Sequence, residues 1–211
     1  MITEETIQTN KEYFLDLVNS IERDGMNKDR LIAQLTNSDF FTAPASAIYH
    51  NAFLGGLCLH SLNVYKTLIA LCDAMYPENT CPYDTNTLKI VALFHDFDKM
   101  NKYEATVMNK KVYSESGTKY DQMGKYDWIS VPGFKRKDAS ECFVFGTHGD
   151  NSAYMTETFI PLTTEEYAAI INHHGCFDNP KADITPIFNR YSLACLLHTA
   201  DMLSTYVVEK I

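Results

Sequence analysis

The stretch VALFHDFDK, residues 91–99, joins an apolar run to an adjacent imidazole and carboxylate, His95 and Asp96. Val91, Ala92 and His95 share one helical face, so the run predicts a buried helix that Asp96 closes. Imidazole and carboxylate groups both bind metal ions, and the two oxygens of one carboxylate can bridge a pair of ions. The stretch therefore predicts a helix end that carries metal ligands.

Further side chains of this kind lie along the rest of the chain. His60 precedes the stretch, His148 and the pair His173-His174 follow it, and Asp201 comes last. Four imidazoles and two carboxylates suit a pair of divalent ions with one aspartate between them. Helical bundles build such sites by projecting one or two ligands from each helix into a common interior. The spacing therefore favours a bundle of four or five helices.

The composition is that of an ordinary globular protein. The chain has 211 residues, 45% of them hydrophobic and 21% charged, which is enough for one domain with a sizeable core. We expect a single domain over 1–211, with N-terminal helices in 1–45 and the metal-binding core in 46–211. No apolar run approaches the ~20 residues of a membrane helix, and the acidic segment 1–6 does not resemble a secretory signal. The six cysteines lack a Cys-x-x-Cys motif, which predicts free thiols and a cytoplasmic location.

Positive charge is concentrated in one segment. The net charge is −9, yet residues 99–137 contain nine basic and four acidic side chains. The overall negative charge argues against an extended nucleic-acid surface. The basic segment is either a solvated loop or a cationic lid that draws a small anionic substrate toward the metal site.

Apolar residues at helical spacing predict the helices. We expect helices over 3–22, after a cap at Asn27, over 57–75 and over 188–208. In the third of these, His60 shares the apolar face, so its imidazole should point inward.

Thr163 and Glu166 form a capping box that predicts a helix through to His173. On a helix, neighbouring residues lie roughly 100° apart, so His173 and His174 should not both face the site. His173 is the expected metal ligand and His174 the expected substrate contact. The reverse assignment stays open.

The segment 100–147 breaks the helical pattern. It is rich in Tyr, Lys, Gly and Ser, and Ala105–Tyr113 and Tyr126–Val131 have strand-like composition. We expect a small β-hairpin or ordered loop inserted into an otherwise all-α fold. Trp128 and the neighbouring tyrosines form either a small hydrophobic cluster or a surface that stacks on a nucleobase.

Taken in order, several short runs resemble the HD-domain metal-dependent phosphohydrolases. The runs are LGGLCLHS at 54–61, HDFDK at 95–99, HHG at 173–175 and LHTAD at 197–201. The match covers roughly residues 50–208. It implies an all-α helical bundle, here with the hairpin or loop inserted around 100–147. The family usually has glycine where Asp98 stands, which changes the local charge at Lys99.

The resemblance also implies two metal ions and their ligands. The first ion would bind His60, His95, Asp96 and Asp201, and the second would bind Asp96, His148 and His173. Iron or manganese fits such a mixed donor set, and cobalt, nickel, zinc and magnesium stay open as alternatives.

By the same resemblance, the expected reaction is hydrolysis of a phosphomonoester or phosphodiester, most simply in a nucleotide, by a metal-bridging hydroxide. The expected catalytic residues are Asp96, Lys99 and His174. Asp96 holds both ions, while Lys99 and His174 neutralise charge and assist the leaving group. Lys99 could instead form a salt bridge to Asp98 or Glu104.

Two other functions stay open. Some HD proteins with nearly the same ligands are mixed-valent di-iron oxygenases, and a non-catalytic binding or sensor module would keep the metals for structure. Among the remaining histidines, His50 is a candidate substrate contact. His198, one turn before Asp201, is expected to support the site without binding metal.

Overall fold

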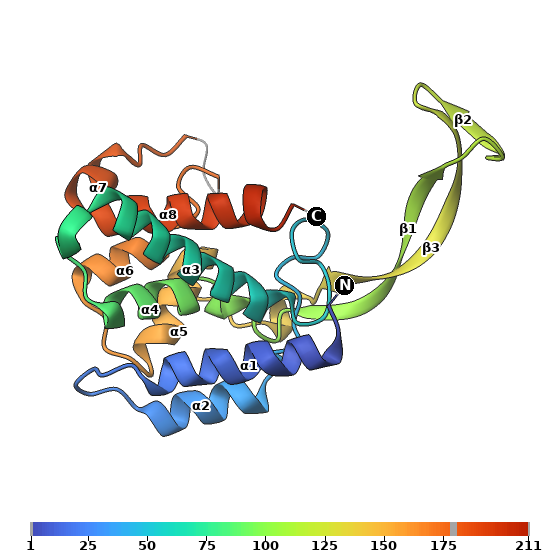
Figure 1. Ribbon diagram of the computed structural model, residues 1–211. Helices are drawn as coiled ribbons and strands as arrows, with labels where there is room; N and C mark the ends of the chain where they lie inside the picture. The colour runs from blue at the N-terminus through green and yellow to red at the C-terminus, as the bar shows by residue number, and fades with distance from the viewer. Residues whose placement is uncertain (1, 178–180, 211) are drawn as a thin grey trace.

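The computed structural model describes residues 2–177 and 181–210. A helical body carries a long β-ribbon that projects away from it (Figure 1). The helices are α1 (Glu4–Asn19), α2 (Lys28–Asn37), α3 (Gly56–Met75), α4 (Thr85–Phe94), α5 (His148–Glu157), α6 (Thr164–Ile171), α7 (Thr185–Arg190) and α8 (Ser192–Leu203). The strands are β1 (Tyr103–Tyr113), β2 (Lys119–Asp121) and β3 (Gly124–Arg136).

The expectation of an all-α fold is wrong, because the ribbon is a substantial antiparallel sheet. β1 pairs with β3 from Tyr103 opposite Arg136 to Tyr113 opposite Tyr126. β2 pairs with the far edge of β3, which gives the order β1-β3-β2. A hairpin inside 100–147 is confirmed. β1 begins earlier than expected, at Tyr103, and β3 extends beyond the expected Tyr126–Val131 at both ends. Long strands are stable here because β-branched and aromatic residues recur along both of them.

Side-chain caps fix where several helices begin. The Asn27 side chain accepts a hydrogen bond from the Arg30 N–H, and Thr163 and Glu166 form a reciprocal capping box, so both expected caps are confirmed. A second capping box, between Thr147 and Asp150, opens α5. This box makes His148 the first residue of α5 and orients it relative to the helix.

The single long helix expected over 188–208 is wrong. α7 ends at Arg190, Tyr191 adopts φ −126° and ψ 88°, and α8 begins at Ser192. After α8 the chain forms a π-helical turn, Ser204–Val208. The break lies where the Glu165 carboxylate on α6 accepts a hydrogen bond from the Leu193 N–H, a contact with the first turn of α8 that periodicity does not reveal.

Two hydrophobic clusters hold the body together. One gathers phenylalanines from α1, α4 and the adjoining loops, with the rings of Phe14 and Phe40 4.9 Å apart. The other joins α3, α4, α6 and α8. Tyr65 and Leu162 pack against both clusters. Each fully buried large apolar side chain stabilises the fold by roughly 1.5–3 kcal/mol, so α3 and α4 are held from two sides.

The six cysteines are free thiols, as their scattered positions predict. None of the described helices combines the length and the apolar character needed to cross a membrane.

A buried ion pair links the N-terminal region to α4 and α6. Glu166 is fully buried and accepts two hydrogen bonds from the Arg23 guanidinium, of 2.5 and 2.9 Å. The Thr163 N–H and the Thr87 hydroxyl also donate to it, each at 2.8 Å. Burial opposes ionisation, but these donors, Arg23 foremost, hold the pKa of Glu166 below its ordinary value.

The substitution Glu166→Gln should therefore destabilise the protein by about 2 kcal/mol at neutral pH, because charged hydrogen bonds are lost from a buried site. The folded pKa is lowered, so the contribution of Glu166 is present above its ordinary pKa and is lost as the pH falls through the folded value. Urea unfolding as a function of pH measures both effects. The variant should lose stability at pH 7 and show a flatter acid dependence, while the exposed control Glu115→Gln should match the wild type. Equal acid dependence in all three proteins would show that Glu166 does not carry this linkage.

Candidate metal centre

The structure brings the six predicted metal ligands together in the interior of the body. His60 comes from α3, and His95 and Asp96 follow the last residue of α4. The other three come from α5, from the turn after α6 and from α8; they are His148, His173 and Asp201. Buried groups drawn from these residues have ligand atoms that lie within 4.8 Å of one another, so they could hold a metal ion.

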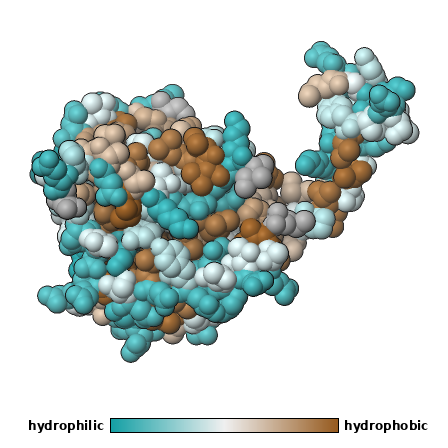
Figure 2. Space-filling model, viewed as in Figure 1, coloured by the Kyte–Doolittle hydropathy of each residue, from teal (hydrophilic) through white to brown (hydrophobic). Residues whose placement is uncertain are grey.

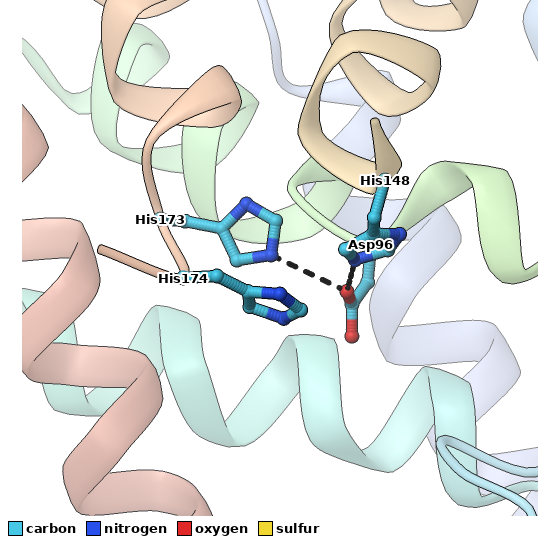
Figure 3. Close-up of side chains that lie close together, drawn as sticks. All are labelled: Asp96, His148, His173 and His174. Carbon is cyan, nitrogen blue, oxygen red and sulfur yellow. Dashed lines mark hydrogen bonds and ion pairs between the residues drawn. The ribbon is translucent and has the colours of Figure 1, made fainter. Parts of the chain in front are cut away.

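Asp96 lies at the centre of this set, and its two oxygens face different pairs of imidazoles. Oδ1 is 2.6 Å from His148 Nε2 and 3.6 Å from His173 Nε2 (Figure 3). Oδ2 is 3.5 Å from Nε2 of both His60 and His95. The carboxylate therefore divides the donor atoms into two groups, one on each oxygen.

Asp201 completes the group on Oδ2. Its Oδ1 lies 3.1 Å from His60 Nε2. The Nε2 atoms of His60 and His95 are 3.3 Å apart. This group thus contains two imidazoles and two carboxylates, which is the donor set that the sequence resemblance implies for one ion.

Backbone carbonyls orient two of the imidazoles. His95 Nδ1 lies 2.8 Å from the Ala92 carbonyl oxygen, and His173 Nδ1 lies 2.6 Å from the Ile170 carbonyl oxygen. A carbonyl only accepts hydrogen bonds, so each Nδ1 carries the proton and each Nε2 presents a lone pair toward Asp96. His173 Nε2 is buried and has no hydrogen-bond partner among the described residues. A lone pair left in this way fits a metal ion.

Two carboxylates, Glu209 and Asp98, orient the other two imidazoles. Neither carboxylate was predicted from the sequence to do so. Glu209 accepts from His60 Nδ1 at 3.1 Å and is itself held by the Asn63 amide at 2.9 Å. Asp98 contacts His148 Nδ1. Carboxylate–imidazole pairs of this kind fix the ring and raise its basicity as a ligand. Asp98 stands inside the HDFDK run, and Glu209 follows Asp201 by about two helical turns, a spacing from which its position near Asp201 could have been predicted.

His173 and His174 both reach the site, against the helical argument. α6 ends at Ile171, so the pair lies in a turn and not on a helix. A nitrogen of each ring belongs to the group that includes Asp96 and His148, and the two rings are 4.3 Å apart (Figure 3). His174 is therefore available either as a metal ligand or as a substrate contact.

Two glycines allow the close approach that this turn requires. A Cβ on Gly149 would lie 2.2 Å from the Ile171 carbonyl oxygen, so only glycine lets α5 meet the end of α6 there. Gly175 has a φ of +57°, and a Cβ on it would lie 2.8 Å from the His198 ring. His198 Nδ1 in turn lies 2.6 Å from the His173 carbonyl oxygen. His198 thus supports the turn, as expected of a residue outside the ligand set.

Lys99 contacts neither of the alternative partners. Its Nζ donates to Asp96 Oδ2 at 2.6 Å in a buried ion pair. Asp98 is paired with Lys102, and Glu104 with Lys135 at 2.9 Å. Lys99 is therefore a cation that lies directly against the Asp96 carboxylate.

Asp96 and His95 are in forms that bind cations, whereas His60 is protonated. Burial would raise the pKa of Asp96, but Lys99 foremost, with the hydrogen bond from His148, holds it well below its ordinary value. Burial lowers the pKa of His95 to about 3, so this imidazole is neutral. For His60, burial is outweighed by Asp201 and Glu209, which raise the pKa to about 10. An ion that binds His60 must therefore displace a proton.

A cavity of about 550 Å³ opens beside these residues. Lys99, His174 and Asp201 lie in its wall, and exposed aromatic rings of Tyr49, Phe177 and Tyr206 surround it. A larger cavity of about 800 Å³, between α6 and the start of α8, contains none of the candidate site residues. Of these two cavities, the one of about 550 Å³ therefore adjoins the candidate site.

Two other sequence candidates have distinct positions. His50 lines the smaller cavity, and its ring centroid is 4.6 Å from that of His60. Burial, with His60 and Lys99, lowers the pKa of His50 to about 4, so it is a neutral group at the site. Trp128 lies far out on the ribbon, where it clusters with Tyr126 and Lys111.

If Glu209 supports His60 as a metal ligand, its replacement should weaken metal binding. Outer carboxylates of this kind contribute about 10- to 100-fold in affinity. We expect a loss near the lower limit for Glu209→Gln, which keeps an acceptor for His60, and near the upper limit for Glu209→Ala. Calorimetric titration with Mn²⁺ measures both, with the exposed Glu78→Gln as the control. Unchanged affinity in both Glu209 variants would contradict the assignment.

Comparison with known proteins finds no relative of this chain. No family model matches the chain, no curated protein matches it, and no solved structure matches it. The case for a function therefore rests on the donor atoms around Asp96, on their burial and on the cavity beside them.

Proposed function

We propose that the protein is a metal-dependent phosphohydrolase of the HD-domain type, which cleaves a phosphate ester beside a pair of divalent ions. The observation that carries this proposal is the division of donor atoms by Asp96. His148 and His173 face one carboxylate oxygen, while His60 and His95 face the other. A carboxylate shared in this way suits two ions ~3.5–4 Å apart, the spacing at which metal pairs clamp a phosphoryl group.

The donor types support a choice of metal. Imidazole nitrogens outnumber carboxylates in the set, which suits iron or manganese and also admits cobalt, nickel or zinc. Magnesium prefers an all-oxygen shell and is the least suited of the candidates. We propose iron or manganese as the pair in the active protein.

The cavity supports an anionic substrate with an aromatic or apolar portion. Lys99 supplies a cation next to Asp96, and Tyr49, Phe177 and Tyr206 supply exposed aromatic surface around the same opening. A volume of about 550 Å³ is within the usual range for small-molecule sites. A nucleotide combines a phosphate with a flat base and is the substrate class that we propose.

The roles of the protein's own groups follow from their positions. Metal ions, when bound, activate a water molecule and offset the charge that develops on the phosphate. Lys99 reaches Asp96 at 2.6 Å and can turn its three N–H donors to phosphate oxygens. His174 lines the cavity and is placed to donate a proton to the leaving oxygen. The aromatic rim excludes water and positions the organic group.

The direct test is hydrolysis of a panel of nucleoside monophosphates, deoxynucleoside triphosphates and a cyclic dinucleotide, with the products separated by chromatography and with Mn²⁺ or Fe²⁺ supplied. We expect turnover of at least one member by the wild-type protein. Asp96→Asn should remove it, by a factor of at least about 10³, because both ions lose a shared ligand. Asp73→Asn, an exposed carboxylate on α3, should leave it intact.

Oxygen uptake is followed in parallel with the same substrates. Turnover that requires O₂, without phosphate release, would replace the proposal by a di-iron oxygenase. No turnover of any kind by metal-loaded protein would replace it by a binding module.

A further inference from the structure

A third cavity lies where the ribbon joins the body. It has a volume of about 430 Å³, and Lys102, Arg136, Lys137 and His148 lie in its wall. Among the residues that the structure describes, no aspartate or glutamate lines it. Lys102 is paired with Asp98, but Arg136 and Lys137 add two more permanent cations to this concave surface in a chain of net charge −9, which favours an anion there.

The register of the ribbon brings these cations together. Tyr103 pairs with Arg136, and the Lys137 N–H donates to the Lys102 carbonyl at 3.0 Å. The pairing therefore continues one residue beyond the strands and sets Lys102 opposite Lys137. Like charges directly opposite each other destabilise a strand pair. A bound anion would relieve this repulsion.

The wall of this cavity is shared with the candidate metal centre. His148 lies 2.6 Å from Asp96 through Nε2 and contacts Asp98 through Nδ1. Lys102 contacts the same Asp98. His148 therefore belongs both to the wall of this cavity and to the donor group around Asp96. His148 is also the first residue of α5, and a helix N-terminus adds partial positive charge.

We propose that this cavity binds a phosphate group that is not the one being cleaved. The proposal rests on the phosphohydrolase function for the source of that group, which we assign to the substrate itself. The substrate class then becomes a molecule with two phosphates, one at the metals and one against Arg136 and Lys137. Guanidinium and ammonium donors hold phosphate through charge-assisted hydrogen bonds. The foot of the ribbon would thereby select longer or more highly phosphorylated substrates.

The double variant Arg136→Gln/Lys137→Gln tests the cavity directly. Lys102 is left in place because it contacts Asp98. Inorganic pyrophosphate is titrated calorimetrically into the full-length protein, with and without a chelator that removes metal-dependent binding. We expect a chelator-resistant site whose affinity falls about tenfold in the variant, as for the loss of charged hydrogen bonds.

The matched control is Lys110→Gln/Lys125→Gln, which removes the same charge from exposed positions far out on the ribbon. It should bind pyrophosphate as the wild type does. Either no chelator-resistant binding, or equal loss in both double variants, would overturn the proposal, because bulk charge alone would then explain the result.

Steady-state kinetics identify the source of the phosphate. Adenosine 3′,5′-bisphosphate and adenosine 5′-monophosphate are compared in the same proteins. The variant should raise KM for the bisphosphate about tenfold and leave KM for the monophosphate within about twofold. Weaker pyrophosphate binding with both KM values unchanged would overturn the assignment to the substrate and point to a separate phosphorylated effector.

The failure of this proposal is distinct from failure of the proposed function. If no nucleotide of the panel or of this pair is hydrolysed, the hydrolase proposal fails, and the pyrophosphate titration still decides whether the cavity binds an anion. If hydrolysis proceeds but the cavity variant behaves as the wild type in both experiments, only the second phosphate site is lost.

Discussion

The carboxylate of Asp96 is the constraint around which the body is built. It is almost fully buried, and an ionised carboxylate in such a place is very costly unless cations and hydrogen-bond donors surround it. Lys99 supplies one cation at 2.6 Å. His95 and His173 present nitrogen lone pairs to the same region, at 3.5 and 3.6 Å from its oxygens. Buried lone pairs and anions that face one another need positive charge to balance them. Divalent ions are the simplest source of that charge.

The rest of the architecture serves to hold that arrangement. α3 and α4 are fixed between two hydrophobic clusters, so the residues they carry have little freedom. α5 and the turn after α6 meet closely because Gly149 has no side chain, and this contact brings His148 beside His173. The π-helical turn after α8 places Glu209 against His60. Distant parts of the chain are thus bound to one centre, and a metal that bound there would stabilise all of them.

The features that could be predicted from the sequence are those set by residues close together in the chain. Helix caps such as Asn27 and Thr163 are local hydrogen bonds, and both occur. The candidate metal ligands could be predicted because their histidines and aspartates lie on or beside apolar helical faces. Other features depend on contacts between distant segments. Just after the break at Tyr191, a carboxylate from α6 contacts the first turn of α8, and the role of Glu209 depends on how the chain turns after α8.

The ribbon shows a different limit of sequence reasoning. Its strand composition was visible, but its length was not, because each strand is stabilised by its partner and not by the body. The strands stand clear of the body, with apolar residues along the stem and polar residues at the tip (Figure 2). In this structure the far part of the ribbon therefore does not form a lid over the cavity beside the candidate metal centre. Only its foot, at Arg136 and Lys137, lies beside the candidate centre.

Whether two metal sites share Asp96 can be measured by elemental mass spectrometry of the purified protein. We expect about two divalent ions per chain, falling toward zero in Asp96→Asn because both sites lose a common ligand. Two ions in the wild type with one retained in Asp96→Asn would contradict the shared role. No bound metal in the wild type, even after reconstitution with iron or manganese, would contradict the metal centre itself.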